Sequence, residues 1–309
     1  MANTNSSGIL MKTGIFAALA AVFYFLFNFF SGKKTDAPTA NLPENPPKTE
    51  QTDGMRPAKQ HPEFEISPSE PAFYEPSSTT GAIVRHTWFS LSYSEDHEQA
   101  EWVAYELTRE RLNANFAERT NIFRPDPEVK TESATPHDYS GGGFDKGHLC
   151  PAADMGFDEK AMDETFYMSN ISPQKKAFNT GIWRELEENT RDWARKFRHV
   201  YVITGPILSK PMDTPPLGFS KVTVPAAFYK VILAGDKGIA FLIPNEKSDL
   251  PLMDYAVTID RAEAVTGLDF FPKMLTGLAE ETEARLDKSA WAVDEKRFAR
   301  RVGDWNLAR

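Results

Sequence analysis

Three apolar, β-branched runs separated by turn residues dominate the second half of this 309-residue chain. Residues 199–207 read HVYVITGPI and end at Gly-Pro, residues 221–233 contain Pro225 at a bend, and residues 238–243 stop at Pro244. Runs of this length and composition predict buried strands, because β-branched side chains fit a pleated surface and proline interrupts a strand ladder. The succession of strands and turns predicts a largely antiparallel sheet.

The residues before this region predict further strands. Residues 82–93, AIVRHTWFSLSY, alternate roughly and are rich in β-branched and aromatic residues, which indicates a strand or hairpin arm. Residues 101–107, EWVAYEL, are short enough for a strand or a helix, and we favour a strand. Residues 108–137 are polar and contain three prolines, so we interpret them as a long ordered loop that carries Arg119 and Arg124.

Residues 254–309, at the C-terminal end of the chain, predict helices outside the sheet. Residues 254–268 are typical of a strand that enters a short helix, with Thr258 or Asp260 as the N-cap. Beyond Lys273 charged and apolar residues alternate, and we expect helix packed on the outside of the domain.

The N-terminus carries a long uncharged stretch. No charged residue occurs from Thr13 to Gly32, and about twenty helical residues span a bilayer core. Lysines flank the stretch on both sides, so the positive-inside rule leaves the orientation open. An uncleaved anchor is favoured over a cleaved signal peptide, because no convincing small-x-small cleavage site follows. We therefore expect a membrane-anchored protein with an extracytoplasmic globular part, periplasmic if bacterial; the alternative is secretion after cleavage.

Composition divides the chain into four segments. Residues 35–76 are rich in Pro, Thr, Glu and Lys, which predicts an extended tether. We expect a transmembrane anchor over residues 1–34, this linker over 35–76, a catalytic domain over 77–275 and a helical extension over 276–309.

The net charge excludes one class of function. A formal charge of -9 and a pI near 5.3 argue against a protein that coats polyanions with a broad basic surface. Any nucleic-acid site must be a local basic cleft, for which the chain offers Lys175, Lys176, Arg184, Arg191 and Arg195. The single cysteine, Cys150, cannot form an internal disulfide, and a zinc site would need further ligands near it.

A glycine-rich segment presents one histidine. Gly141 to Gly143 permit a tight turn, and Gly147 permits close approach of backbone or substrate beside His148. Histidine is the side chain whose unperturbed pKa suits proton abstraction near neutrality. A lone histidine is more often structural, so this assignment depends on what surrounds it.

A predicted helix begins near Asn179 and supplies those surroundings. Ile182, Leu186, Trp193 and Phe197 recur at helical spacing as a buried stripe. A second series steps by four residues along one side of the helix. This slanting row contains Asn179, Trp183, Glu187 and Arg191.

The row matches what phosphodiester hydrolysis needs. The reaction requires an activated water, neutralised phosphate charge and help for the leaving oxygen. Mg²⁺ retains several waters, so one Asn oxygen with a nearby carboxylate suffices, and an Arg can clamp phosphate. Glu187 and Arg191 alone would be read as a surface ion pair.

Five motifs occur in an order that resembles a known family. They are FDKGHLCPAADM, SNISPQ, FNTGIWRELE, VYVITGPI and TGLDFFP, and the resemblance covers residues 82–273. They resemble the DNA/RNA non-specific endonucleases of the ββα-metal type, the group that includes mitochondrial endonuclease G.

This resemblance implies roles for individual residues. It implies that His148 is the general base and that Asn179 is the only direct protein ligand of Mg²⁺. It further implies that Glu187 orders metal-bound waters, that Arg191 lies near the scissile phosphate and that Asn170 supports the site.

One position departs from the family motif. The usual arginine is Lys146, which keeps the charge but loses the planar fork. The resemblance also implies a second phosphate-contacting arginine upstream, for which Arg124 and Arg119 are both open. Lys146, Arg124 and Arg184 are the substrate-binding candidates.

The expected fold is therefore α+β, a central mostly antiparallel sheet with flanking helices and a ββα-metal (His-Me finger) motif between Phe144 and Phe197. The expected function is cleavage of DNA and/or RNA that depends on Mg²⁺, or on Mn²⁺ or another divalent cation. The alternatives are a nucleic-acid-binding module with weak or no cleavage and a phosphodiesterase for another substrate. A homodimer and an inhibitor protein are further partners that we allow for.

Overall fold

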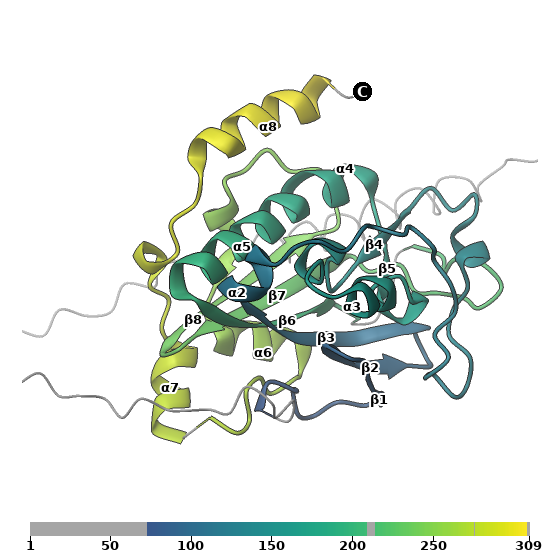
Figure 1. The fold of residues 1–309 in the computed structure, drawn as a ribbon, viewed down its shortest axis with the longest axis horizontal. Helices are drawn as coiled ribbons and strands as arrows, with labels where there is room; N and C mark the ends of the chain where they lie inside the picture. The colour runs from purple at the N-terminus through teal and green to yellow at the C-terminus, as the bar shows by residue number, and fades with distance from the viewer. Residues whose placement is uncertain (1–72, 209–213, 275, 308–309) are drawn as a thin grey trace, which may run out of the picture. The chain divides into compact units, whose positions relative to one another are not determined.

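In a computed structural model of the chain, the described residues are 73–208, 214–274 and 276–307 (Figure 1). The expected anchor, residues 1–34, lies outside them, as does nearly all of the expected tether, residues 35–76. Among the described helices, none is long and apolar enough to cross a membrane.

Nine strands and eight helical segments other than short 3₁₀ turns are described in these ranges. The strands are β1 (Ala82–Arg85), β2 (Phe89–Ser94), β3 (Gln99–Thr108), β4 (Asp145–His148), β5 (Ile171–Gln174), β6 (His199–Pro206), β7 (Ala227–Ala234), β8 (Lys237–Pro244) and β9 (Ala256–Val257). The helices are α2 (Arg109–Asn113), α3 (Glu159–Glu164), α4 (Lys176–Phe178), the π-helical segment η5 (Asn179–Trp183), α5 (Arg184–Phe197), α6 (Ile259–Thr266), α7 (Thr276–Ala284) and α8 (Glu295–Leu307).

The predicted antiparallel sheet is confirmed. In the described part of the chain, seven strands pair in the order β1-β2-β3-β6-β7-β8-β9, and every pairing is antiparallel. Strands β4 and β5 form a separate two-stranded ribbon. With helices on the sheet, the fold is the α+β class that the motifs predicted.

Some predicted boundaries were wrong. The strand expected from residue 221 begins at Ala227, because Pro225 cannot donate to the ladder. The loop expected over residues 108–137 opens with α2, whose N-cap Thr108 accepts from the backbone N–H of Arg111. Thr258 caps α6, which decides between the two N-cap candidates.

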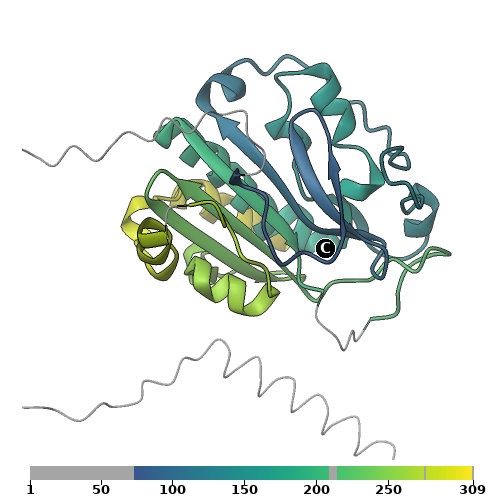
Figure 2. The same cartoon turned by 90° about the horizontal axis from the view of Figure 1, so that it is seen from below.

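Helices cover both faces of the sheet. Helix α5 packs across β3, β6 and β7, whereas α6 packs on β7 and β8 and α7 packs on β8 (Figure 2). Successive side chains of β7 point to opposite faces of the sheet. Phe228 stacks on Phe178 on one face, with ring centroids 5.2 Å apart, and Tyr229 contacts Phe270 on the other, with ring centroids 5.6 Å apart. Burial of apolar side chains on both faces thus fixes α5 on the sheet.

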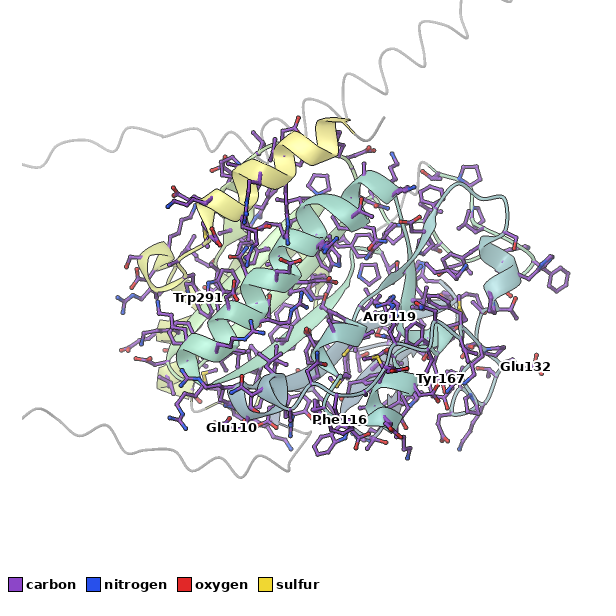
Figure 3. The ribbon with its side chains drawn as sticks, turned by 45° about the horizontal axis from the view of Figure 1, so that its top comes forward. Glu110, Phe116, Arg119, Glu132, Tyr167 and Trp291 are labelled. Carbon is purple, nitrogen blue, oxygen red and sulfur yellow. The ribbon has the colours of Figure 1, made fainter. Side chains whose placement is uncertain are left out.

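Residues 291 and 292, between α7 and α8, pack against the C-terminal part of α5. Trp193 stacks on Phe241 with ring centroids 5.8 Å apart, and its indole N–H donates to the Ala292 carbonyl at 2.8 Å. Trp291 packs edge-on against Trp193 at 5.2 Å (Figure 3). This part of the chain therefore contacts α5 through Trp193.

Candidate active site

The β4–β5 ribbon presents His148 at its end. In this register Gly147 lies opposite Ser172 and His148 lies opposite Ile171. The imidazole sits between two rings, with centroids 5.0 Å from Phe166 and 5.6 Å from Phe123. The ribbon and the two phenylalanines therefore fix the position of the histidine.

The environment of His148 keeps it neutral. Burial, and secondly the guanidinium of Arg119, lower the pKa of the imidazole to about 3. Its Nε2 atom is shielded and has no hydrogen-bond partner in the described part of the chain. At neutral pH the ring is an unprotonated base, which is the state that proton abstraction requires.

Gly147 is required by close packing rather than by its backbone angles. A Cβ atom there would overlap the side chain of Gln174, which is fully buried on β5. We predict that Gly147→Ala lowers the free energy of unfolding by about 1–3 kcal/mol through overpacking and lowers activity by displacing His148. Urea unfolding and turnover measure the two effects. Gly277→Ala is the control, because a Cβ there meets nothing within 4 Å, and equal stability of the two variants would contradict the prediction.

Asn179 stands at the start of a helix that is interrupted once. Segment η5 is π-helical, and Gly181 within it has non-helical angles of φ -100 and ψ -117. Asn179 Nδ2 donates to Asp145 Oδ2 at 2.9 Å. A carboxylate only accepts, so this bond turns the amide nitrogen toward β4 and leaves the amide oxygen for another partner. Asp145 thus orients Asn179, a role that the sequence did not reveal.

The π-helical segment also corrects the expected row. Trp183 is fully buried and stacks with Phe178 at 5.2 Å, so it belongs to the core. Asn179, Glu187 and Arg191 line the cleft as the row predicted. A uniform 3.6-residue period places all four side chains on one side, but the non-helical angles of Gly181 break the helix between Asn179 and Trp183, so the four residues do not follow one regular period.

Glu187 is a carboxylate in a shielded position. Burial raises the pKa of its carboxyl to about 7, although the charges of Lys230 and Arg191 favour the ionised form. Lys230 is fully buried on β7, with its ammonium 5.0 Å from the ring centroid of Trp183. A single lysine within the apolar run AFYKVILA was the sequence signal for this charge.

Arg191 is held by a buried carboxylate. Its Nη1 donates to Asp154 Oδ1 at 2.8 Å, and the hydroxyl of Tyr105 donates to Asp154 Oδ2 at 2.8 Å. Despite the opposing effect of burial, the carboxylates of Asp154 and Glu187 raise the pKa of Arg191. The guanidinium is therefore permanently charged and fixed at the cleft wall, where it can contact an anion.

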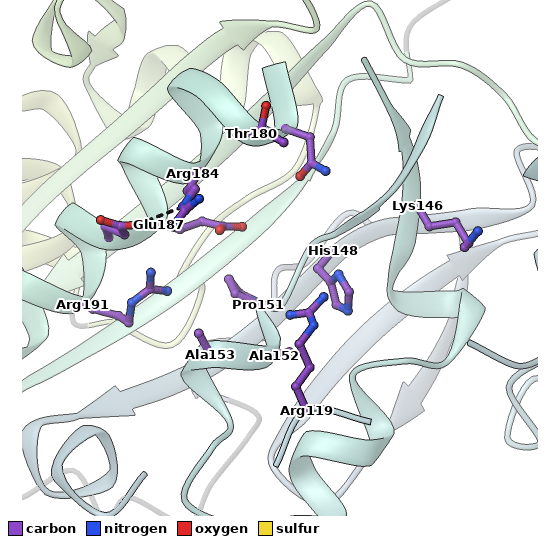
Figure 4. A pocket seen from close by; sticks show the side chains of 12 residues that line it. Arg119, Lys146, His148, Pro151, Ala152, Ala153, Thr180, Arg184, Glu187 and Arg191 are labelled. Atoms are coloured by element: carbon purple, nitrogen blue, oxygen red, sulfur yellow. Dashed lines mark hydrogen bonds and ion pairs between the residues drawn. The ribbon is translucent and has the colours of Figure 1, made fainter. Parts of the chain in front are cut away.

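These side chains meet in one cleft of about 880 Å³, including its open mouth. Figure 4 shows His148 and Arg119 facing Glu187 and Arg184 across it. The lining residues are Arg119, Lys146, His148, Pro151, Ala152, Ala153, Asn179, Thr180, Arg184, Glu187, Glu188 and Arg191.

Of the two upstream arginine candidates, Arg119 lies at the cleft and Arg124 does not. Arg119 lines the cleft and lies over Phe166 at 5.1 Å. Arg124 is absent from the lining and binds both carboxylate oxygens of Asp163, at 2.5 Å and 3.2 Å. The substrate-binding assignment of Arg124 is therefore not supported by its position, and Arg119 is the cation in place.

Asn170 is close to the catalytic ribbon but does not line the cleft. It is fully buried, accepts from the Cys150 N–H at 2.9 Å, and donates to the carbonyls of Cys150 and Thr165 at 3.0 Å and 2.9 Å. Its place is that of a support for the backbone after His148, not of a group that touches reacting atoms. Cys150 itself is a buried free cysteine.

The remaining predicted cations differ in position. Lys146 and Arg184 line the cleft, and the ammonium of Lys146 lies 5.2 Å from the Phe123 ring centroid. Lys175 instead pairs with Glu246, and Arg195 pairs with Asp192 at 3.1 Å, so neither is in the lining.

The donor set fits a hard divalent cation. Asn179 can contribute its amide oxygen, because only the amide nitrogen is used in the bond to Asp145. Glu187 can contribute a carboxylate, whose charged form is disfavoured by burial and would be stabilised by a nearby cation. Oxygen ligands of this kind suit Mg²⁺ or Mn²⁺, and the described residues that line the cleft include no cysteine or second histidine to favour a softer ion.

The antiparallel sheet, the ribbon bearing His148 and the helix bearing Asn179 define a protein of the ββα-metal type. The family model described as DNA/RNA non-specific endonuclease matches residues 69–277. The chain belongs to that family, and the resemblance drawn from its motifs is confirmed.

Several mitochondrial nucleases are similar to this chain. "Nuclease EXOG, mitochondrial" of Xenopus laevis is 36% identical over 203 residues, which is 60% of this chain and 57% of the relative. "Endonuclease G, mitochondrial" of Homo sapiens is 35% identical over 203 residues, 60% of this chain and 68% of the relative. The chain thus spans little more than half of the frog relative.

A solved structure has the same fold. A crystal structure of the EndoG/EndoGI complex, which concerns the mechanism of EndoG inhibition, matches with a TM-score of 0.59 and 29% identity. The match covers 64% of this chain and 89% of that chain.

The expected localisation was wrong. We expected a membrane-anchored, extracytoplasmic enzyme, whereas the relatives are named mitochondrial nucleases, including the "Mitochondrial nuclease" of Saccharomyces cerevisiae at 34% identity over 215 residues. An uncharged stretch of sequence is compatible with several destinations, so it could not select one.

Proposed function

We propose that this protein is a divalent-cation-dependent endonuclease that hydrolyses phosphodiester bonds of DNA and/or RNA. One observation carries the proposal most directly: a neutral His148 faces a cleft in which the Asn179 amide oxygen is left available by the Asp145 bond. A base and a cation ligand in one cleft are the two parts that hydrolysis of a phosphodiester requires. Membership of the endonuclease family supports the same reaction.

The mechanism assigns one task to each cleft residue. His148 accepts a proton from the attacking water, which then attacks phosphorus in line with the leaving 3′ oxygen, so the products carry 5′ phosphates. Arg191 and Arg119 contact the phosphate oxygens from opposite sides of the cleft. Asn179 would hold the cation and Glu187 would orient water beside it; when bound, the cation would supply positive charge for the phosphate and the leaving oxygen.

The charge of the cleft fits a polyanionic substrate on an acidic protein. Four cations, Arg119, Lys146, Arg184 and Arg191, line it together with two carboxylates. The chain as a whole carries a formal charge of -9. Positive charge focused in a cleft attracts a phosphate backbone locally, so the acidic composition does not oppose the proposal.

Substrate and partners follow from the same site. Arginine contacts to phosphate carry no base information, which favours cleavage without sequence specificity. An inhibitor protein stays a prediction, supported by the EndoG/EndoGI complex among similar structures, and a homodimer also stays a prediction.

The test is digestion of plasmid DNA and of a structured RNA by the full chain, with Mg²⁺, with Mn²⁺ and with EDTA. We expect nicking of both substrates with either metal and none with EDTA. Binding without cleavage under every metal condition would instead support the binding-module alternative. Turnover of a dinucleotide or a small phosphodiester alone would support a different substrate.

Metal dependence should change with pH because of Glu187. Below a pKa of about 7 this carboxyl is protonated in the metal-free protein, and a cation must displace the proton. The Mg²⁺ concentration for half-maximal activity should therefore rise as pH falls below 7, by up to about tenfold per unit. Titrations at pH 6, 7 and 8 measure this, and Glu187→Gln should flatten the dependence. A pH-independent Mg²⁺ requirement in the wild type would contradict it.

A further inference from the structure

The C-terminal helix α8 lies along α5 and shares a charged interface with it (Figures 1 and 3). Arg301 of α8 donates to Glu185 Oε2 at 2.6 Å through Nη1 and to Glu188 through Nη2. Arg297 donates to Asp192 Oδ2 at 2.7 Å and to Glu185 Oε1 at 3.3 Å. Two guanidinium groups of α8 thus lie among three carboxylates of α5.

Glu188 connects this interface to the cleft. It is one of the lining residues, and its Oε1 accepts from Arg184 Nε at 3.1 Å, drawn as a dashed line in Figure 4. Its other oxygen, Oε2, accepts from Arg301. A continuous series of contacts therefore runs from Arg301 through Glu188 to Arg184.

The contact between Arg184 and Glu188 is the more exposed of the two contacts that Glu188 makes with Arg184 and Arg301. Arg184 is 60% exposed, whereas Glu188 is 18% exposed and Arg301 is 19% exposed. An exposed i,i+4 pair on its own holds a long side chain weakly. A carboxylate that is already held from behind by an arginine bridging it to buried Glu185 loses less freedom when it binds a second partner, so Arg301 pre-organises the Arg184 contact.

Burial and charge on the α5 side keep this arrangement in place. Glu185 is 1% exposed, and its Oε1 also accepts from Asn189 Nδ2 at 2.8 Å. Glu188 is held from two sides, by Arg301 on one oxygen and by Arg184 on the other.

We propose that α8 is a positioning element of the active site: Arg301, acting through Glu188, fixes the Arg184 guanidinium at the cleft, where it binds a backbone phosphate of the nucleic acid beside the scissile one. The proposal rests on the proposed function for the identity of the ligand. Helix α8 begins at Glu295, beyond residues 69–277 that the family model matches, so this contribution belongs to the extension of this chain.

A double-mutant cycle tests the proposal on the full chain with a short duplex as substrate. Arg184→Ala should raise KM and reduce the slope of log affinity against log salt by about 1, as loss of one phosphate contact does. Arg301→Ala should raise KM about threefold with kcat nearly unchanged, within the range for coupled neighbours. Because both act on one contact, the double variant should have the KM and salt slope of Arg184→Ala alone.

Two further variants separate positioning from general stability. Arg301→Lys keeps the charge but loses the planar fork that directs one N–H group to each of two carboxylates, so it should reverse only part of the rise in KM. Arg300→Ala removes an exposed charge from the same helix and should leave KM as in the wild type. If Arg301→Ala does not fold, Glu188→Gln takes its place in the cycle. Additive effects in the cycle, or equal KM for the Arg301 and Arg300 variants, would overturn the proposal.

Binding measured in a His148→Ala background keeps this test independent of cleavage. The same cycle is recorded there as Kd for the duplex at constant Mg²⁺. A wild type that binds but never cleaves would refute the proposed function, while a non-additive Kd cycle would still support the positioning role. An active wild type with an additive Kd cycle would refute the positioning role alone.

Discussion

His148→Ala is expected to lower kcat by about 10²–10⁴-fold on both DNA and RNA, the range that a positioned general base contributes. The ring touches Phe123 and Phe166 and has no hydrogen-bond partner on Nε2 within the described residues, so its removal takes away the base without breaking a polar network. Duplex binding should persist, because the phosphate contacts come from arginines on other elements. Single-turnover rates and Kd values measure the two quantities separately.

The matched control for this variant is His137→Ala, because His137 is an exposed histidine on the segment before the ribbon. It should cleave at the wild-type rate. Equal nicking by the His148 and His137 variants would remove His148 from the mechanism and leave water activation to another group.

Asn179→Ala should have the second largest effect, because it removes the amide oxygen that we propose as the cation ligand. We expect the Mg²⁺ concentration for half-maximal activity to rise by more than the roughly 10–100-fold that loss of an outer-shell partner causes, with a fall in kcat at all accessible Mg²⁺ concentrations. Asp145→Ala removes only the group that orients Asn179, so its effect should lie within that 10–100-fold range. Metal titrations of activity, and calorimetry with Mn²⁺, measure both.

A charge swap makes the orientation argument specific. Asn179→Asp keeps an oxygen but places two carboxylates against each other, since Asn179 Nδ2 and Asp145 Oδ2 are 2.9 Å apart. The double variant Asp145→Asn with Asn179→Asp restores one donor and one acceptor, so it should recover metal affinity relative to Asn179→Asp alone. Asn113→Ala, at an exposed asparagine in α2, is the control. Full activity of Asn179→Ala at low Mg²⁺ would refute the ligand assignment.

The sequence predicted the central site because its signals are local. His148 stands in a glycine-rich segment of a short ribbon. Asn179 and Glu187 lie in two consecutive helical segments, η5 and α5. The sheet was also predictable, because β-branched runs and the prolines that end them act on their own neighbours. The role of Asp145 could not be predicted, although the residue lies in the same motif as His148, because only the fold brings it to its partner Asn179.

Residues paired across long sequence distances were beyond such reasoning. Arg119 and Arg124 look alike in the chain, and only the fold brings Asp163 to Arg124 while leaving Arg119 at the cleft. Trp183 fits a helical row by spacing, yet the π-helical segment turns it into the core.

The sequence by itself determined the class of fold and the endonuclease family, and it predicted His148 and Asn179 as the site, because strand propensity, turn chemistry and ordered motifs are properties of short segments. Only the tertiary structure decided which cations face the cleft, how the Asn179 amide is turned and that Arg301 reaches Glu188 from the far end of the chain. The physical reason is that a charge acts through its nearest partners, and those partners are set by packing of the whole domain rather than by neighbours in sequence.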